Sequence, residues 1–206
     1  MMQDEAGAKD DAYWMGLALE EASKARRLSP PNPSVGAVIV KEGRVIGRGF
    51  TQQTGGPHAE VMALRDAAAG GESVEGATIY VTLEPCSHWG RTPPCALAII
   101  EHKLGRVVTS VSDPNPQVAG RGLKMIREAG IEVTEGVRSD EGWLSNRGFL
   151  TRMTTGRPWV RMKCAATLDG RTAFPDGRSQ WITGPQARED AQYWRGVSGA
   201  IVTGIG

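Results

Sequence analysis

One histidine and two cysteines stand where predicted secondary-structure elements begin or end, and together they suit a metal ion. His58 follows a Gly-Gly turn at the start of a predicted helix. Cys86 follows a predicted strand, and Cys95 opens the next predicted helix. One imidazole and two thiolates suit zinc, and a catalytic zinc site keeps its fourth position for water. The spacing therefore predicts a zinc site with three protein ligands.

Glu60 lies two residues after His58, close enough to reach a metal-activated water without being a ligand itself. His-x-Glu followed by Pro-Cys and a second Cys is the pattern of zinc deaminases, in which activated water attacks an amidine carbon and the glutamate moves protons. We therefore expect Glu60 to be the catalytic proton shuttle. The helix start at Cys95 also favours a thiolate, which predicts a lowered pKa for that thiol.

A structural zinc site is the alternative, and it needs a fourth protein ligand. His88 and His102 are the available candidates. A closed four-ligand site leaves Glu60 without a task, which favours the open, catalytic site. A non-catalytic zinc module would be favoured if His88→Ala released the metal.

The elements that position these residues alternate between helix and strand after a first helix and a hairpin. Helical spacing predicts helices over Asp11–Arg27, His58–Ala69, Cys95–His102, Gly122–Ala129 and Asp140–Met153. Extended apolar patterns predict strands over Val35–Val40, Val45–Phe50, Thr78–Leu83, Arg106–Ser112 and Ile131–Glu135. Strands that alternate with helices imply a layered α/β domain around a largely parallel sheet.

A linker is predicted at Thr154–Pro158, which gives a deaminase domain over 1–153, a linker over 154–158 and a further domain over 159–206. Patterns in the last part predict strands over Trp159–Thr167 and Ala200–Thr203 around a helix over Pro185–Arg195. A strand, a helix and a strand cannot close a core, so we expect this second domain to be truncated.

The size, charge and cysteine content of the chain disfavour some classes of function. The 206 residues, 40% of them hydrophobic, suffice for one core and part of a second. A net charge of +1 disfavours nucleic-acid binding, and no window approaches the roughly 20 apolar residues of a membrane helix. Three cysteines fit a reducing compartment, which predicts a cytoplasmic location. Cys164, in an apolar strand pattern, is expected to be buried and without chemistry.

Eight residues, not the two of the general pattern, separate Cys86 from Cys95. The segment Glu84–Cys95 (EPCSHWGRTPPC) closely resembles the long zinc loop of the riboflavin-biosynthesis deaminase/reductase family. Pro31–Val40, His58–Val61, Asp113–Gly122 and, past the linker, Leu168–Ala173 and Ser179–Thr183 resemble the same family. The resemblance implies a three-layer α/β/α cytidine-deaminase-like domain with a mixed sheet, followed by the start of an α/β reductase domain.

The resemblance also implies the reaction: hydrolysis of 2,5-diamino-6-(5-phosphoribosylamino)pyrimidin-4-one to 5-amino-6-(5-phosphoribosylamino)uracil, with release of ammonia. Residues implied around this phosphorylated pyrimidine are Asn32, Arg91, Asp113 and Asn115. An asparagine amide offers both donor and acceptor, and an arginine offers a fork of donors to phosphate. The alternatives are plain turn residues, or a solvated charge at Arg91. Another nucleobase, nucleoside or tRNA-base deaminase of the same fold is the competing function.

The second domain carries further implied contacts. By resemblance, Thr172 and Trp181 would contact NADPH, and Ser179 and Arg195 the substrate of the reduction step. Because most of that domain is missing here, we expect NADPH binding and reductase activity only in a full-length form. Thr51 stands where family members commonly carry a histidine, which puts the substrate in doubt but not the zinc chemistry. Related deaminase folds often assemble, so a homo-oligomer is possible.

Overall fold

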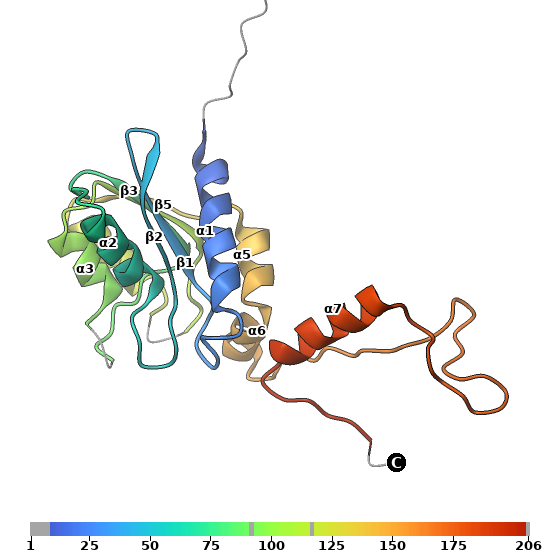
Figure 1. The fold of residues 1–206 in the computed structure, drawn as a ribbon. Coiled ribbons are helices and arrows are strands. Elements are labelled where there is room, and N and C mark those ends of the chain that lie inside the picture. Colours follow the sequence, from blue (N-terminus) through green and yellow to red (C-terminus); the bar gives the residue numbers. More distant parts are fainter. Residues whose placement is uncertain (1–8, 91–92, 116–117, 205–206) are drawn as a thin grey trace, which may run out of the picture. The chain divides into compact units, whose positions relative to one another are not determined.

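The computed structural model describes residues 9–90, 93–115 and 118–204, and it divides the chain into two compact units, Met1–Trp159 and Val160–Gly206. The first unit is built on a five-stranded sheet of order β2-β1-β3-β4-β5 (Figure 1). Its strands are β1 (Gly36–Lys41), β2 (Arg44–Phe50), β3 (Thr78–Leu83), β4 (Arg106–Val111) and β5 (Glu132–Thr134). Its helices are α1 (Asp11–Ala25), α2 (Ala59–Ala69), α3 (Cys95–Glu101), α4 (Arg121–Glu128), α5 (Ser139–Ser145) and α6 (Arg147–Thr155).

The sheet is mixed, as predicted. Strand β1 pairs antiparallel with both β2 and β3, whereas β3 pairs parallel with β4 and β4 with β5. The expectation of a largely parallel sheet is therefore wrong, because two of the four pairings are antiparallel. Both antiparallel pairings involve β1. It forms a hairpin with β2, and β3 joins the sheet on the other side of β1 and runs antiparallel to it.

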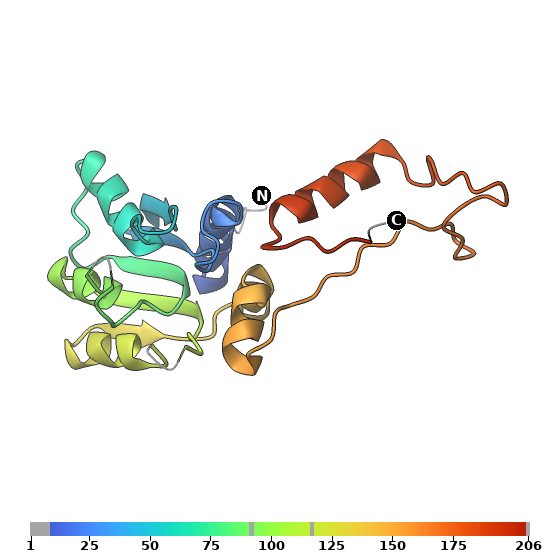
Figure 2. The ribbon, with the colours of Figure 1, turned by 90° about the horizontal axis from the view of Figure 1, so that it is seen from below.

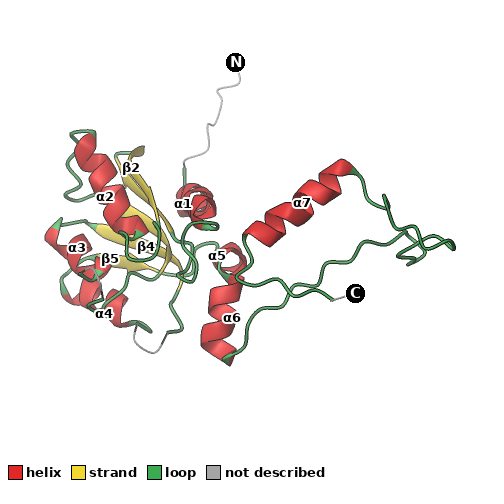
Figure 3. Cartoon of the chain, turned by 60° about the horizontal axis from the view of Figure 1, so that its bottom comes forward, coloured by secondary structure: helices red, strands yellow, loops and turns green. Residues whose placement is uncertain are grey.

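Two apolar clusters cover opposite faces of the sheet and make the three layers. Neighbouring residues of a strand alternate between them, because successive strand side chains point to opposite faces. Ala37 and Ile39 of β1 belong to the cluster formed with α2, α3 and α4, whereas Val38 and Val40 belong to the cluster formed with α1. Figures 2 and 3 show helices on both sides of the sheet. The predicted α/β/α domain is confirmed.

Two glycines let helices approach the strands closely. A Cβ at Gly36 would lie 2.0 Å from the carbonyl oxygen of Ala18 in α1, and one at Gly49 would lie 2.3 Å from that of Ala59 in α2. Such distances are far below van der Waals contact, so neither position accepts a larger residue without a shift of the helix. Gly49 therefore fixes the first turn of α2, which begins directly after His58.

The predicted closing helix Asp140–Met153 is wrong in one respect: it is two helices, α5 and α6, that meet at Asn146. Asn146 leaves helical geometry, with φ −116° and ψ 25°. Its buried side chain instead accepts a hydrogen bond from the backbone N–H of Ser34 and donates one to the Ser34 carbonyl oxygen. This tertiary contact accompanies the break and ties α6 to the start of β1.

The unit Val160–Gly206 contains α7 (Pro185–Gly196), close to the predicted helix Pro185–Arg195. The predicted strands Trp159–Thr167 and Ala200–Thr203 are wrong, since neither range joins a ladder in the described part of the chain. Extended segments become strands only through hydrogen bonds to a neighbour. Cys164 lies in the first of these two ranges. Because that range joins no sheet, Cys164 is exposed rather than buried as expected. Among the described residues, no helix is long and apolar enough to cross a membrane.

Candidate active site

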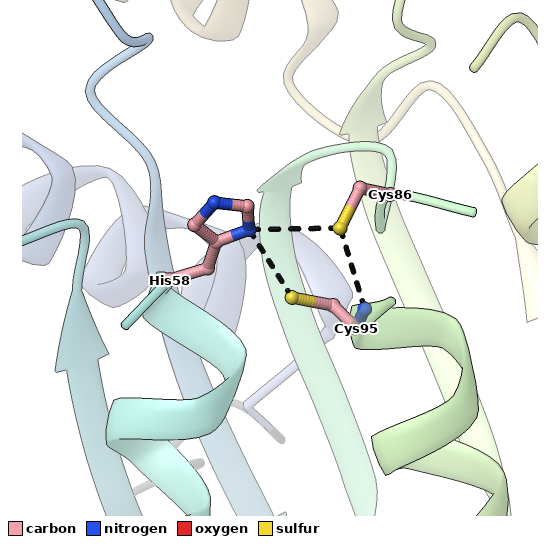
Figure 4. Close-up of side chains that lie close together, drawn as sticks. All are labelled: His58, Cys86 and Cys95. Carbon is pink, nitrogen blue, oxygen red and sulfur yellow. Dashed lines mark hydrogen bonds between the residues drawn. The ribbon is translucent and has the colours of Figure 1, made fainter. Parts of the chain in front are cut away.

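The three predicted ligands meet beside the carboxyl end of the central strand β3, each at or near the beginning or end of a helix or strand. His58 is the N-cap of α2, Cys86 follows β3, and Cys95 is the first residue of α3. His58 Nδ1 lies 3.6 Å from Cys86 Sγ and 3.3 Å from Cys95 Sγ (Figure 4). Their ligand atoms all lie within 4.8 Å of one another. The structure thus gathers residues that are up to 37 positions apart in the chain.

This cluster has the dimensions that zinc requires. With Zn–S bonds near 2.3 Å and Zn–N bonds near 2.0–2.1 Å, a tetrahedral site places sulfur and nitrogen about 3.6 Å apart. The two observed separations, 3.6 and 3.3 Å, are close to that value. The cluster also attracts positive charge: a hydrogen bond to Cys86 raises the pKa of His58 to about 9. The residues present therefore fit a zinc ion.

The thiolate is favoured at Cys86, not at Cys95. A hydrogen bond from the Cys95 thiol, followed by those from the His58 ring and the Cys95 backbone N–H, lowers the pKa of Cys86 to about 4. The hydrogen bond to Cys86 and then burial raise the pKa of Cys95. The predicted lowering at Cys95 is therefore wrong. The first N–H of α3 points to Cys86 Sγ at 3.3 Å, so the helix start stabilises the neighbouring sulfur.

Glu60 lies in the first turn of α2 and is almost fully buried, with 3% of its surface exposed. Burial raises the pKa of its carboxyl group to about 7, against the opposing effect of His58. It is not part of the group of ligand atoms. A carboxyl group that is buried beside a metal site, without ligating it, can accept and return a proton near neutral pH.

A cavity of about 270 Å³ opens beside the cluster and collects most of the predicted deaminase residues. Its lining includes the ligands His58 and Cys86, the acid Glu60, and the predicted substrate residues Asn32, Asp113 and Asn115. Arg91, the predicted phosphate contact, lies outside the described residues.

Thr51 also lines this cavity, and it is buried. Its hydroxyl group is engaged with the backbone of Val35, accepting from the N–H at 3.2 Å and donating to the carbonyl oxygen at 3.4 Å. Residue 51 therefore braces the start of β1 as well as lining the cavity.

The closed four-ligand site does not form among the described residues. His102 is exposed, and its Nδ1 pairs with the Ala98 carbonyl oxygen at 2.8 Å. His88 is exposed and lines the cavity, but it does not belong to the group of ligand atoms. The three-ligand arrangement leaves a position for water, which is the arrangement of catalytic zinc.

Several residues of this site were not predicted from the sequence. Phe149 and Met153 of α6 supply an apolar wall of the cavity, together with Val118. Glu84 is 4% exposed and accepts three backbone hydrogen bonds near the cavity. A charged residue at the end of a buried strand is the signal that could have identified Glu84, since unpaired charges are rarely buried.

The predicted reductase residues lie in the second unit. Thr172, Ser179, Trp181 and Arg195 are all exposed, and the guanidinium of Arg188 lies 4.2 Å from the centre of the Trp181 ring. Their roles toward NADPH and toward a second substrate stay predictions.

Comparison with known proteins agrees with this geometry. Residues 8–111 match the family model "Cytidine and deoxycytidylate deaminase zinc-binding region", and residues 158–206 match the "RibD C-terminal domain". The riboflavin biosynthesis protein RibD of Escherichia coli is 55% identical over 193 residues, which are 94% of this chain and 52% of that protein. The chain thus spans about half the length of the curated relatives it matches.

Solved structures of RibD proteins have the same fold as most of this chain. RibD of Acinetobacter baumannii superposes with a TM-score of 0.85 at 51% identity, covering 94% of this chain and 53% of that one. The solved structure of a Thermotoga maritima diaminohydroxyphosphoribosylaminopyrimidine deaminase/5-amino-6-(5-phosphoribosylamino)uracil reductase superposes with a TM-score of 0.85 at 46% identity. The match covers 90% of this chain and 52% of that one. With its zinc-binding deaminase region and the beginning of a RibD C-terminal domain, the chain belongs to the RibD deaminase/reductase family of riboflavin biosynthesis.

Proposed function

We propose that this chain is a zinc-dependent pyrimidine deaminase that converts 2,5-diamino-6-(5-phosphoribosylamino)pyrimidin-4-one to 5-amino-6-(5-phosphoribosylamino)uracil. One observation carries the proposal: the His58, Cys86 and Cys95 cluster and the buried, non-ligating Glu60 adjoin one cavity. The named activity of the Thermotoga maritima relative supports the choice of substrate.

His58, Cys86 and Cys95 would hold the zinc ion, which supplies Lewis-acid activation of water when bound. Glu60 removes a proton from the attacking water through a carboxylate oxygen and delivers it to the ring nitrogen that is double-bonded to C2. It then carries the remaining hydroxyl proton to the leaving amino group at C2 of the pyrimidine. The C2–N bond breaks, a C2–O bond forms, and ammonia leaves. Burial suits Glu60 to both steps, since it raises the pKa of the carboxyl group to about 7, where the group can both accept and return a proton at neutral pH.

The substrate is oriented by the polar residues of the cavity. Asn32, Asp113 and Asn115 face the cavity beside the cluster, where they can hydrogen-bond the pyrimidine and the ribose. Arg91 takes the phosphate as a fork of donors. Residues 1–153 form the deaminase domain, 154–158 the linker, and 159–206 part of a reductase domain.

That reductase domain binds NADPH through Thr172 and Trp181, and its substrate through Ser179 and Arg195, in a full-length form. The protein acts in the cytoplasm on a small phosphorylated pyrimidine, without nucleic acid, and as a homo-oligomer.

The test is ammonia release by the zinc-loaded chain from four compounds: the diaminopyrimidine ribose phosphate, cytidine, dCMP and an adenosine-containing tRNA anticodon loop. We expect turnover of the first compound alone. Turnover of any other compound in preference to it would overturn the substrate assignment, and release from none would overturn the deaminase activity of this chain.

A further inference from the structure

Glu84 stands at the carboxyl end of β3, two residues before Cys86, and its carboxylate is turned toward the segment that follows β4. Its backbone N–H continues the pairing of the two strands by donating to the Val111 carbonyl oxygen at 2.9 Å. The side chain is 4% exposed and therefore has almost no water to solvate it. A carboxylate so placed must be satisfied by protein donors.

Three backbone N–H groups satisfy it. Oε2 accepts from Asp113 at 3.2 Å and from Gly120 at 3.0 Å, and Oε1 accepts from Gly122 at 3.2 Å. All three donors belong to the short segment 113–122, which connects β4 to the start of α4. The carboxylate thus binds the backbone on both described sides of this connection, at residue 113 and at residues 120 and 122.

The segment is also packed closely against the residue between Glu84 and Cys86. A Cβ at Gly122 would lie 1.9 Å from the carbonyl oxygen of Pro85. Gly120 has φ +80°, a left-handed conformation that glycine adopts readily. The same two glycines that donate to the carboxylate therefore also allow the backbone to approach it this closely.

The consequence concerns the substrate cavity. Asp113 and Asn115, which line it, lie on the segment that Glu84 holds. The Asp113 side chain accepts a hydrogen bond from the Asn115 backbone N–H at 2.8 Å, so the two residues are linked to each other. Cys86, one of the three proposed metal ligands, follows Glu84 by two residues.

We propose that Glu84 is a positioning residue, whose buried carboxylate clamps residues 113–115 and 118–122 against Pro85 and Cys86 and thereby sets Asp113 and Asn115 at a fixed distance from the metal cluster. This proposal rests on the function proposed above, because the two polar residues matter only if they bind substrate. Glu84 also borders the cavity, but its oxygens accept three backbone N–H groups of residues 113, 120 and 122, so the role assigned to it is to position those residues and not to contact the reacting atoms.

The test compares Glu84→Gln with Glu21→Gln as a matched control. Glu21 is equally buried, at 4% exposed, but lies in α1 and accepts from Lys24 and Arg48 side chains. In Glu84→Gln one oxygen becomes an NH₂ group that faces a backbone donor. We therefore expect KM for the diaminopyrimidine to rise on the order of tenfold, with kcat changed by less than about threefold and zinc content unchanged. Glu21→Gln should keep both constants.

Amide hydrogen exchange, followed residue by residue by NMR, tests the clamp without any substrate. In Glu84→Gln the amides of Asp113, Gly120 and Gly122 should exchange at least about tenfold faster, whereas Glu21→Gln should leave them protected. Unchanged protection at these three amides would overturn the clamp, whatever the activity. Faster exchange with an unchanged KM would overturn the positioning of substrate residues. A wild-type chain without turnover would refute the proposed function, and amide exchange would still decide whether the clamp exists.

Discussion

The side-chain amide of Asn146 makes two hydrogen bonds with the backbone of Ser34, 112 residues earlier in the chain. It accepts from the Ser34 N–H at 2.7 Å and donates to the Ser34 carbonyl oxygen at 2.9 Å, and both residues are buried. Asn32, two residues before Ser34, lines the substrate cavity, and so does Phe149 of α6. This pair of hydrogen bonds therefore holds two walls of the cavity together.

Asn146→Ala removes both hydrogen bonds and leaves two buried backbone groups without partners. We expect a loss of roughly 2–4 kcal/mol in the free energy of unfolding, because each unsatisfied buried group costs about 1–3 kcal/mol. Urea unfolding of the zinc-loaded chain measures it. Asn146→Asp keeps an acceptor for the Ser34 N–H, but it sets a buried carboxylate oxygen against the Ser34 carbonyl oxygen, so it should also be less stable than wild type. Equal stability of Asn146→Ala and wild type would contradict the account.

Single substitutions of the three ligands should each remove zinc. We expect less than about one tenth of the wild-type zinc content in His58→Ala, Cys86→Ala and Cys95→Ala, because an incomplete ligand set binds a catalytic zinc weakly. Atomic emission after dialysis measures the content. His102→Ala and Cys164→Ser are matched controls, since both residues are exposed and lie outside the cluster. His88→Ala should also keep its zinc, and loss of metal there would instead support a closed structural site.

Gly49→Ala should weaken both the fold and the metal site. The new Cβ would lie 2.3 Å from the Ala59 carbonyl oxygen and push the first turn of α2, which begins directly after His58. Gly36→Ala is the matched control, because its Cβ would collide with α1, on the other face of the sheet. Both variants should lose stability by about 1–3 kcal/mol. Competition with a chelator should show weaker zinc binding in Gly49→Ala alone, and equal zinc affinity in the two variants would refute this reasoning.

The ion pair between Asp11 and Arg106 should give stability that depends on pH. Arg106 donates to both Asp11 oxygens, at 2.8 and 2.7 Å, and this hydrogen bonding lowers the pKa of Asp11. Because the folded pKa is the lower one, the stabilisation is complete above the pKa of an unfolded aspartate, about 3.9, and is lost as pH falls through the folded value.

Asp11→Asn should therefore cost about 1 kcal/mol at pH 7, a figure reduced for partial solvent screening, and almost nothing near pH 2. Thermal unfolding at the two pH values measures the difference. Glu72→Gln, which breaks the exposed pair with Arg44, should unfold like wild type at pH 7. A constant penalty for Asp11→Asn at both pH values would contradict the assignment.

The elements of the first unit could be predicted from the sequence because their patterns are local. The spacing of apolar residues placed α1, α2 and β3 within about two residues of their observed bounds. The ligands could be predicted as well, since the types and order of His58, Cys86 and Cys95 carry the chemistry. The three side chains meet in the structure, as a shared metal site requires, and local spacing alone could not establish that meeting.

What could not be predicted depends on contacts between distant residues. The break at Asn146 follows a hydrogen-bonded pair with Ser34, and no local pattern at 140–153 announces it. The lowered pKa of Cys86, rather than of Cys95, depends first on the hydrogen bond from the Cys95 thiol and then on those from the His58 ring and the Cys95 N–H, which meet only in the folded chain. The predicted strand Trp159–Thr167 has apolar residues in a suitable pattern, but a strand also needs a neighbour, which the pattern does not supply.

The central claim is that Glu60 moves the proton of a zinc-dependent deamination, and Glu60→Gln tests it most directly. Zinc content and the initial rate of ammonia release from the diaminopyrimidine ribose phosphate should be measured on wild type and variant together. The account predicts one zinc per chain in both proteins, with the rate reduced on the order of a thousandfold or more in the variant. A zinc-loaded Glu60→Gln chain that keeps more than about a tenth of the wild-type rate would contradict it.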